Sequence, residues 1–139
     1  MPQFEPYLFF DGNCAEAMRF YERLLGGKIE AMMTHAESPA PAQSPPGMSD
    51  RIMHARLNVG GRILMASDSM VGKPIGGSKG FSLSLSYATT GEAKKIFDAL
   101  AEGGRITMPM QESFWAKAFG MLVDRYGTAW MVNGEPAPM

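Results

Sequence analysis

An internal repeat constrains the fold of this chain more than any single motif does. Residues 14–25 and 91–101 both carry apolar side chains at helical spacing, which predicts two amphipathic helices. The helix-capping residue types Asn13 and Thr89 precede them, 76 positions apart, and a glycine pair follows each helix. A glutamate three residues after each cap predicts a capping box at both helix starts. Matched starts and stops at nearly constant spacing indicate two similar halves.

The predicted strands give both halves the same element order. Each helix follows a short apolar strand, at 7–10 and 81–87, and precedes a strand that opens with a basic residue and isoleucine. A two-residue hairpin signal, Gly60-Gly61, separates two further strands in the first half. The order is β-α-β-β-β twice, an α+β fold class, in a single domain 1–139 with module one at 1–70 and module two at 71–139. The other predicted segments are strands 52–59, 63–67, 118–123 and 129–132, a mobile surface loop at 36–50 and a link at 72–80.

The composition excludes several classes of protein. Hydrophobic residues make up 45% of the 139, enough for a core, and a net charge of -1 gives no electrostatic case for nucleic acid or membrane partners. The first residues lack the basic start of a signal peptide, and the one cysteine, Cys14, cannot form an internal disulfide. We therefore expect a cytoplasmic protein with neither a nucleic-acid nor a membrane partner.

Strand alternation divides the predicted sheets into two faces. In residues 81–87 every second side chain is apolar, so one face of the strand should pack under a helix: Phe81, Leu83, Leu85 and Tyr87. Ser82 and Ser84 should then point to the opposite face. Along residues 53–59, His54 and Arg56 share the polar face in the same manner. This pattern indicates either a groove lined by polar groups or a solvated sheet face.

Three residues are candidates for catalysis, each with a structural alternative. His54 can exchange a proton near neutral pH or serve as a hydrogen-bonded structural histidine. Arg56 can hold an anionic group in a fork or form a plain salt bridge. Glu112, next to aromatic residues, can act as a base or be an exposed loop carboxylate.

Other residues are candidates for binding or for structure. Trp115 and Phe119 can wall a ligand site or belong to the core, and Trp130 is predicted to be core. Cys14, in the first turn of a helix, is either a reactive thiol or a small buried residue. Asp68 and Asp124 follow strand ends and are predicted to form turns.

Three segments of the sequence carry a family resemblance that covers nearly the whole chain. FYERLLGG after a short strand resembles the vicinal-oxygen-chelate superfamily, which includes glyoxalase, bleomycin-resistance proteins and dioxygenases. MHARLNVGGRILMASD and ESFWAKAFGMLVDRYGTAWMVN resemble its PhnB-like subfamily, often labelled 3-demethylubiquinone-9 3-methyltransferase-like. The resemblance implies two βαβββ modules forming a cupped mixed sheet around a cavity, with helices on the outer face, and a homodimer.

The superfamily's enzymes hold a divalent metal through His, Gln and Glu at four strand positions. The resemblance places these positions at Pro6, Met65, Ser82 and Met131, which do not provide that donor set. We therefore predict no metal ligands and no cofactor. The glycines end helices or form hairpins, so the sequence shows no glycine-rich strand-to-helix turn for S-adenosylmethionine.

Three hypotheses follow for the function. The first is a small-molecule ligand bound in a cavity of a homodimer, with activity resting on His54, Arg56 and Glu112. The second is a sequestering protein that binds without turnover. The third is a divalent-metal lyase or dioxygenase with displaced ligands. The residues predicted to contact the ligand are Ser82, Ser84, Trp115, Phe119, Met65 and Met131.

Overall fold

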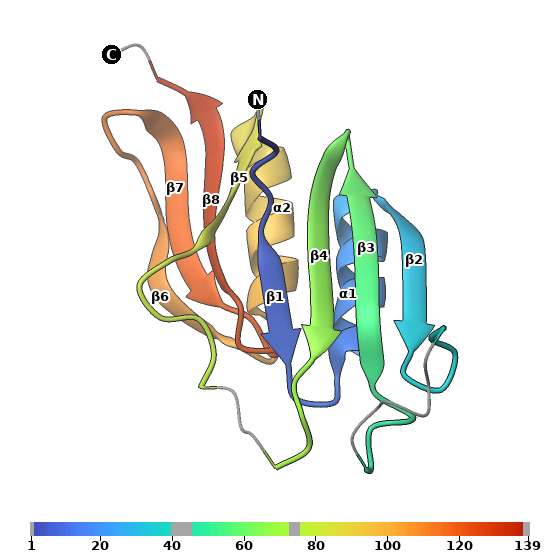
Figure 1. Ribbon diagram of the computed structural model, residues 1–139. Coiled ribbons are helices and arrows are strands. Elements are labelled where there is room, and N and C mark those ends of the chain that lie inside the picture. Colours follow the sequence, from blue (N-terminus) through green and yellow to red (C-terminus); the bar gives the residue numbers. More distant parts are fainter. Residues whose placement is uncertain (1, 40–45, 73–75, 138–139) are drawn as a thin grey trace. The chain divides into compact units, whose positions relative to one another are not determined.

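The computed structural model describes residues 2–39, 46–72 and 76–137, and it confirms the repeated β-α-β-β-β order (Figure 1). The chain divides into two compact units, Met1–Ile75 and Gly76–Met139. The first contains β1 (Tyr7–Phe10), α1 (Cys14–Leu25), β2 (Lys28–Thr34), β3 (Ile52–Val59) and β4 (Arg62–Asp68). The second contains β5 (Leu83–Tyr87), α2 (Thr90–Ala101), β6 (Arg105–Gln111), β7 (Ala116–Val123) and β8 (Ala129–Pro136).

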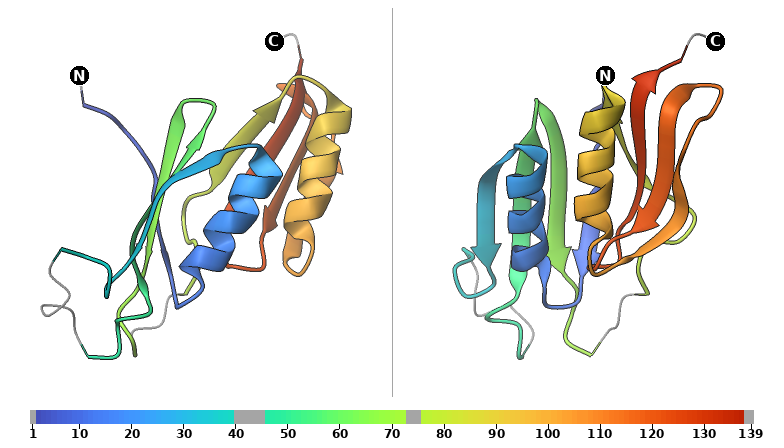
Figure 2. Two further views of the ribbon diagram at one scale, coloured as in Figure 1. Left: turned by 90° about the vertical axis from the view of Figure 1, so that its right-hand side faces the viewer. Right: turned by 180° about the vertical axis from the view of Figure 1, so that it is seen from behind.

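The first unit is a four-stranded mixed sheet covered on one face by a helix. Its strand order is β1-β4-β3-β2, with β1 parallel to β4 and the other neighbours antiparallel. Helix α1 packs on β2, β3 and β4 (Figure 2). Met18 and Tyr21 of the helix are fully buried, as is Leu57 of β3, so the apolar stripe predicted for α1 forms the core here.

The second unit repeats this arrangement with its own sheet, in the order β5-β8-β7-β6 and with β5 parallel to β8. Phe97 and Leu100 of α2 are buried against the sheet, as is Leu122 of β7. Glycine allows the close approach of this helix, because a Cβ at Gly134 would lie 2.6 Å from the Cβ of Ala93. The open face of each sheet, opposite its helix, is the face on which the polar side chains were predicted.

The two helix starts differ, although the sequence predicts the same cap for both. The box at α2 is confirmed, since the Glu92 N–H donates to Thr89 Oγ at 3.1 Å and the Thr89 hydroxyl donates to Glu92 Oε1. The prediction for Asn13 is wrong, because its side chain makes no capping bond at α1. The backbone N–H groups of Gly12 and Cys14 donate to Asp68 Oδ1 instead.

Several boundaries also differ from the predictions. Strand β5 begins at Leu83, and Phe81 is 57% exposed, so the prediction that Phe81 packs under a helix is wrong. Within the predicted surface loop 36–50, Ser38 and Met48 are buried, while 40–45 lie outside the described residues. The Gly60-Gly61 turn is confirmed, with both φ angles positive as a type I′ hairpin requires. Among the described residues, no helix has the length and apolar character needed to span a bilayer.

Candidate functional site

The open face of the first unit gathers three of the predicted site residues. Arg56 of β3 pairs in register with Met65 of β4, and His54 lies two residues before Arg56 on the same strand. Tyr7 of β1 pairs with Met65 and places its ring 6.1 Å from the imidazole of His54. Ala55, between His54 and Arg56, is fully buried on the opposite side, so the predicted alternation is present here.

The Arg56 guanidinium on this face is held in an ion pair. Its Nε donates to Glu30 Oε1 at 2.9 Å, and Asn58 Nδ2 donates to Glu30 Oε2 at 3.1 Å. The hydrogen bonds from Arg56 and then Asn58 lower the pKa of the Glu30 carboxyl. Both members of the pair are about 40% exposed, so an anionic ligand would have to compete with Glu30 for Arg56.

Four more of the predicted site residues lie on the open face of the second unit. Ser84 of β5 pairs with Met131 of β8. The ring of Trp115, just before β7, packs edge-on against Phe119 with centroids 4.9 Å apart. Phe119 is 5% exposed, which agrees with its predicted core alternative, whereas Trp115 is half-buried.

Asn133 links these residues and was not predicted from the sequence. Its Oδ1 accepts a 3.0 Å hydrogen bond from Trp115 Nε1, and its Nδ2 donates to Ser84 Oγ and to the Leu85 carbonyl. Both amide protons are thus used, which fixes the orientation of the amide and, through it, of the indole. The signal that could have found Asn133 is its alternation with Met131 along the last strand.

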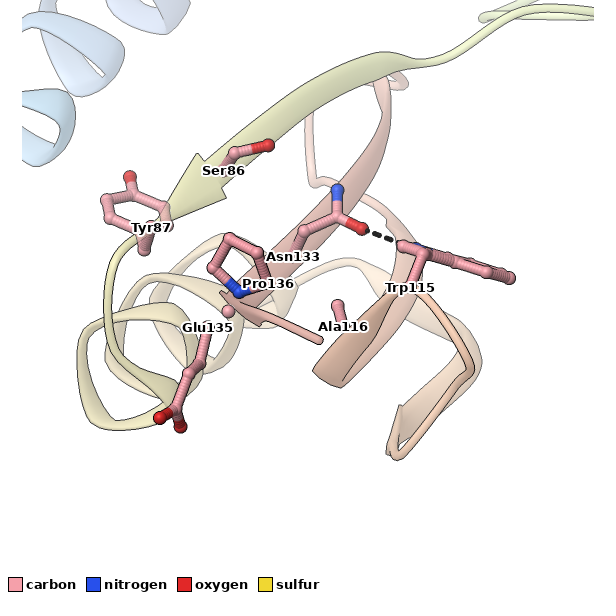
Figure 3. Close-up of a pocket in the computed structure, with 8 residues that line it drawn as sticks. Ser86, Tyr87, Trp115, Ala116, Asn133, Glu135 and Pro136 are labelled. Atoms are coloured by element: carbon pink, nitrogen blue, oxygen red, sulfur yellow. Dashed lines mark hydrogen bonds between the residues drawn. The ribbon is translucent and has the colours of Figure 1, made fainter. Parts of the chain in front are cut away.

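A pocket of about 260 Å³ opens beside this network, where β5 ends and β8 continues with β7 as its one partner in the sheet (Figure 3). It is lined by the end of β5, the end of β8 and the start of β7, all within the second unit. Figure 3 shows Asn133 between the Trp115 indole on one side and Tyr87 and Glu135 on the other. Burial raises the pKa of Tyr87, and the Glu92 carboxylate raises it further, so its hydroxyl stays protonated at neutral pH.

Of the nine predicted site residues, Trp115 is the one that lines this pocket; Ser84, Phe119 and Met131 lie on the same open face but outside the lining. Glu112 is exposed on the segment before β7, which is its predicted structural alternative. Ser82 is half-buried but precedes the first residue of β5. Neither lines the pocket that Trp115 and Asn133 form.

The donor set on the strands does not fit the metal that the superfamily binds. The β1–β4 register places Tyr7 opposite Met65, and the β5–β8 register places Ser84 opposite Met131. Thioether, hydroxyl and phenol groups are poor ligands for Mn²⁺, Fe²⁺ or Zn²⁺ compared with imidazole and carboxylate. In the parts of the chain that the structure describes, no three His, Cys, Asp or Glu side chains gather as a metal site.

Cys14 adopts the second of its two predicted roles, that of a buried small residue. It is fully buried, and burial, with the Asp68 carboxylate adding to it, raises the pKa of its thiol to about 12. We expect native protein at pH 8 to react with a disulfide reagent about a thousandfold more slowly than protein in urea, because the thiolate is scarce. Spectrophotometric titration of this single thiol measures both rates, and equal rates would contradict the burial.

The fold and the open sheet faces define the class of protein. The structure has a TM-score of 0.64 to the fosfomycin resistance protein FosX of Listeria monocytogenes, at 8% identity, over 95% of this chain and 90% of that one. The two βαβββ units therefore share the fold of that protein. The chain belongs to the family described as 3-demethylubiquinone-9 3-methyltransferase, whose model matches residues 2–133. The PhnB-like resemblance seen in the sequence is thereby confirmed.

Three relatives are similar over almost their whole length. Protein YjdN of Escherichia coli K12 is 39% identical over 92% of each chain. The structure of protein PA1353 from Pseudomonas aeruginosa is 50% identical, covers 97% of this chain and 98% of that chain, and has a TM-score of 0.88. The PhnB protein of Bacillus cereus is 28% identical, covers 96% and 99%, and has a TM-score of 0.81.

Proposed function

We propose that this chain binds a small organic molecule in the pocket of its second unit, with an aromatic or apolar part of the molecule against Trp115. The observation that carries the proposal is the hydrogen-bonded chain from Trp115 through Asn133 to Ser84. A half-buried indole could change its orientation at little cost in free energy. Here its N–H donates to an amide whose own two protons both donate hydrogen bonds, so the indole is held in one orientation. Such pre-orientation lowers the entropic cost of binding a ligand.

The surroundings of Trp115 favour a planar or apolar ligand. Phe114 and Phe119 both pack edge-on against its ring, at centroid distances of 4.8 and 4.9 Å. Met121 and Met131 pair across β7 and β8 on the same open face, and both are half-buried. Aromatic walls together with adaptable thioethers are typical of sites that accept apolar molecules of variable shape.

Replacing Asn133 with leucine tests this proposal. Leucine keeps the volume but removes the acceptor of the Trp115 N–H, so we expect affinity for a neutral one-ring probe such as 2-phenylethanol to fall about tenfold. The indole N–H signal of Trp115 in a two-dimensional ¹H–¹⁵N NMR spectrum reports both the lost hydrogen bond and the binding.

The matched control is Gln111→Leu, which makes the same kind of change at an exposed position of β6. We expect it to leave the Trp115 signal and the affinity unchanged. Unchanged affinity in Asn133→Leu, with its indole signal shifted, would show that the fixed indole does not contribute to binding.

The open face of the first unit, taken by itself, carries the residues that we propose for chemistry if the protein is an enzyme. His54, half-buried beside Tyr7, would act as acid or base, and Arg56 would hold an anionic group after exchange with Glu30. Glu112 would act as a base only if a ligand or a partner subunit covered it. Recovery of unchanged probe would favour sequestration, whereas turnover that survives chelators and is lost in His54→Ala would favour an enzyme.

A homodimer completes the proposal, and exposed apolar side chains on the edge strand β1 support it. Phe9 is 57% exposed and Tyr7 39% exposed on this strand, which has only β4 beside it in its sheet. We expect light scattering to give a molar mass of about twice 15.1 kDa, and Phe9→Glu to lower it. A monomeric mass at micromolar concentrations would contradict the assembly.

A further inference from the structure

The charged groups at the second-unit pocket are mainly carboxylates. Among the eight described residues that line it, Glu135 has the one carboxyl side chain, and none is a lysine, arginine or histidine. A second carboxylate, that of Glu92, acts electrostatically on Tyr87 at the same end of the pocket. The counter-charge is Lys117, whose Nζ lies 3.4 Å from Glu135 Oε1, with the two side chains 55% and 42% exposed. A pair so long and so exposed is weak, so Glu135 is available to another cation.

The backbone of Glu135 is an independent sign that this position is specialised. Its φ of 54° is in the left-handed region, and among the described residues it is the one non-glycine with a positive φ. Glutamate is disfavoured there, and such residues persist where their surroundings hold them, often at ligand sites.

Both neighbours of Glu135 are held in place. Gly134 lies against α2 so closely that it has no room for a side chain, and Pro136 pairs with Ala116 of β7. The N–H of Ala137 donates to the Trp115 carbonyl at 2.9 Å. The backbone contacts that hold the residues next to Glu135 therefore also hold the backbone of Trp115. The backbones that carry the carboxylate and the indole are thus fixed relative to each other.

We propose that the pocket selects a small aromatic amine, with its ring toward Trp115 and its ammonium group toward Glu135. This inference rests on the proposed binding function and names the ligand class of the same site. Figure 3 shows the two groups on opposite sides of Asn133, which suits a ligand that is apolar at one end and cationic at the other. The volume of about 260 Å³ is below the range usual for drug-sized ligands, so a single ring with a short side chain is the fitting size.

Three probes of nearly equal shape test the charge preference in the full-length protein: 2-phenylethylamine, 2-phenylethanol and 3-phenylpropanoate. The Trp115 indole N–H signal at pH 7 and low salt measures each affinity. We expect the amine to bind about tenfold more tightly than the alcohol, and the carboxylate to bind more weakly than either. In Glu135→Gln the amine should fall to the affinity of the alcohol, whose own affinity should not change.

Two further variants sharpen the result. Lys117→Met removes the competing cation and should strengthen amine binding severalfold, whereas Glu102→Gln, an exposed change at the end of α2, should alter nothing. Glu135→Gly should raise the melting temperature, since glycine accepts a positive φ, while abolishing the preference for the amine. Because the two expected effects have opposite signs, this one substitution distinguishes a loss of ligand preference from a loss of stability.

The outcomes distinguish this inference from the proposed function on which it rests. If the alcohol binds but the amine binds no more tightly, or if Glu135→Gln retains the preference, the inference about charge is wrong and the binding pocket stands. If none of the three probes shifts the Trp115 signal, both are wrong.

Discussion

Replacing Asp68 with alanine is expected to lower the free energy of unfolding by about 4 kcal/mol. The carboxylate is 7% exposed and accepts three backbone N–H groups: those of Gly12 and Cys14 at Oδ1 and that of Ile52 at Oδ2. Two of these bonds are buried, so alanine would leave their N–H groups without the carboxylate acceptor away from water. The loss would separate the start of α1 and the start of β3 from the end of β4.

Urea denaturation with Asp50→Ala as the matched control measures this effect. Asp50 is an exposed aspartate of the same unit, and its replacement should change stability by less than about 0.5 kcal/mol. Asp68→Asn should be intermediate, since an amide retains one acceptor oxygen but loses the charge. Equal losses for Asp68→Ala and Asp50→Ala would show that the three bonds do not stabilise the fold.

Replacing Asp124 with alanine should have a comparable effect on the second unit, again about 4 kcal/mol. This carboxylate is 3% exposed, and its Oδ1 accepts the N–H groups of Tyr126 and Thr128. Its Oδ2 accepts the indole N–H of Trp130 at 2.8 Å, within the core. Alanine would leave a buried indole donor without its acceptor and would open the turn between β7 and β8.

The indole of Trp130 provides a local measurement of this change. We expect its near-ultraviolet circular dichroism and its indole NMR signal to change in Asp124→Ala at temperatures where the protein is still folded. Asp98→Ala, which removes only the exposed 3.4 Å pair with Lys94 on α2, should leave both unchanged and cost under about 0.5 kcal/mol. Loss of stability without any change at Trp130 would assign the effect to the turn alone.

These two aspartates show how far local reasoning from the sequence extends. The turn predicted at Asp124 is confirmed, because its three donors lie two, four and six residues along the chain. The turn predicted at Asp68 is wrong, because its three donors lie 16 to 56 positions away. The chemistry of the residue type was the same in both cases, but only the tertiary structure decides which N–H groups reach a carboxylate.

The helix caps follow the same rule. Thr89 and Glu92 are three residues apart, so the cap of α2 is a property of the local sequence. Asn13 has a suitable side chain but makes no capping bond, and Asp68 of the distant strand β4 instead accepts the N–H groups of the residues on either side of it, Gly12 and Cys14. The start of α1 is thus held by a charged acceptor from a distant strand, which the local sequence does not indicate.

The sequence predicted which face of the sheet carries the candidate site, but not which residues line the pocket. Alternation placed Ser84 and Met131 on the open face of the second unit, and the structure pairs them. The pocket itself arises because β8 extends past its last partner on β5, a boundary that the apolar pattern does not mark. Glu112, proposed from its aromatic neighbours in sequence, is exposed, because Trp115 packs on Phe119 and Phe114 packs on Trp115.

The repeat from which the fold was predicted is determined by the sequence alone. Helix periodicity, strand alternation and glycine stops act within a few residues, so they define two β-α-β-β-β units without tertiary contacts. Three features are decided only by the tertiary structure: the hydrogen bonds of Asp68 to the start of α1, the hydrogen bond from Trp115 to Asn133, and the positive φ of Glu135. Each of these depends on strand register between segments far apart in the chain, and register is set by packing of the whole unit.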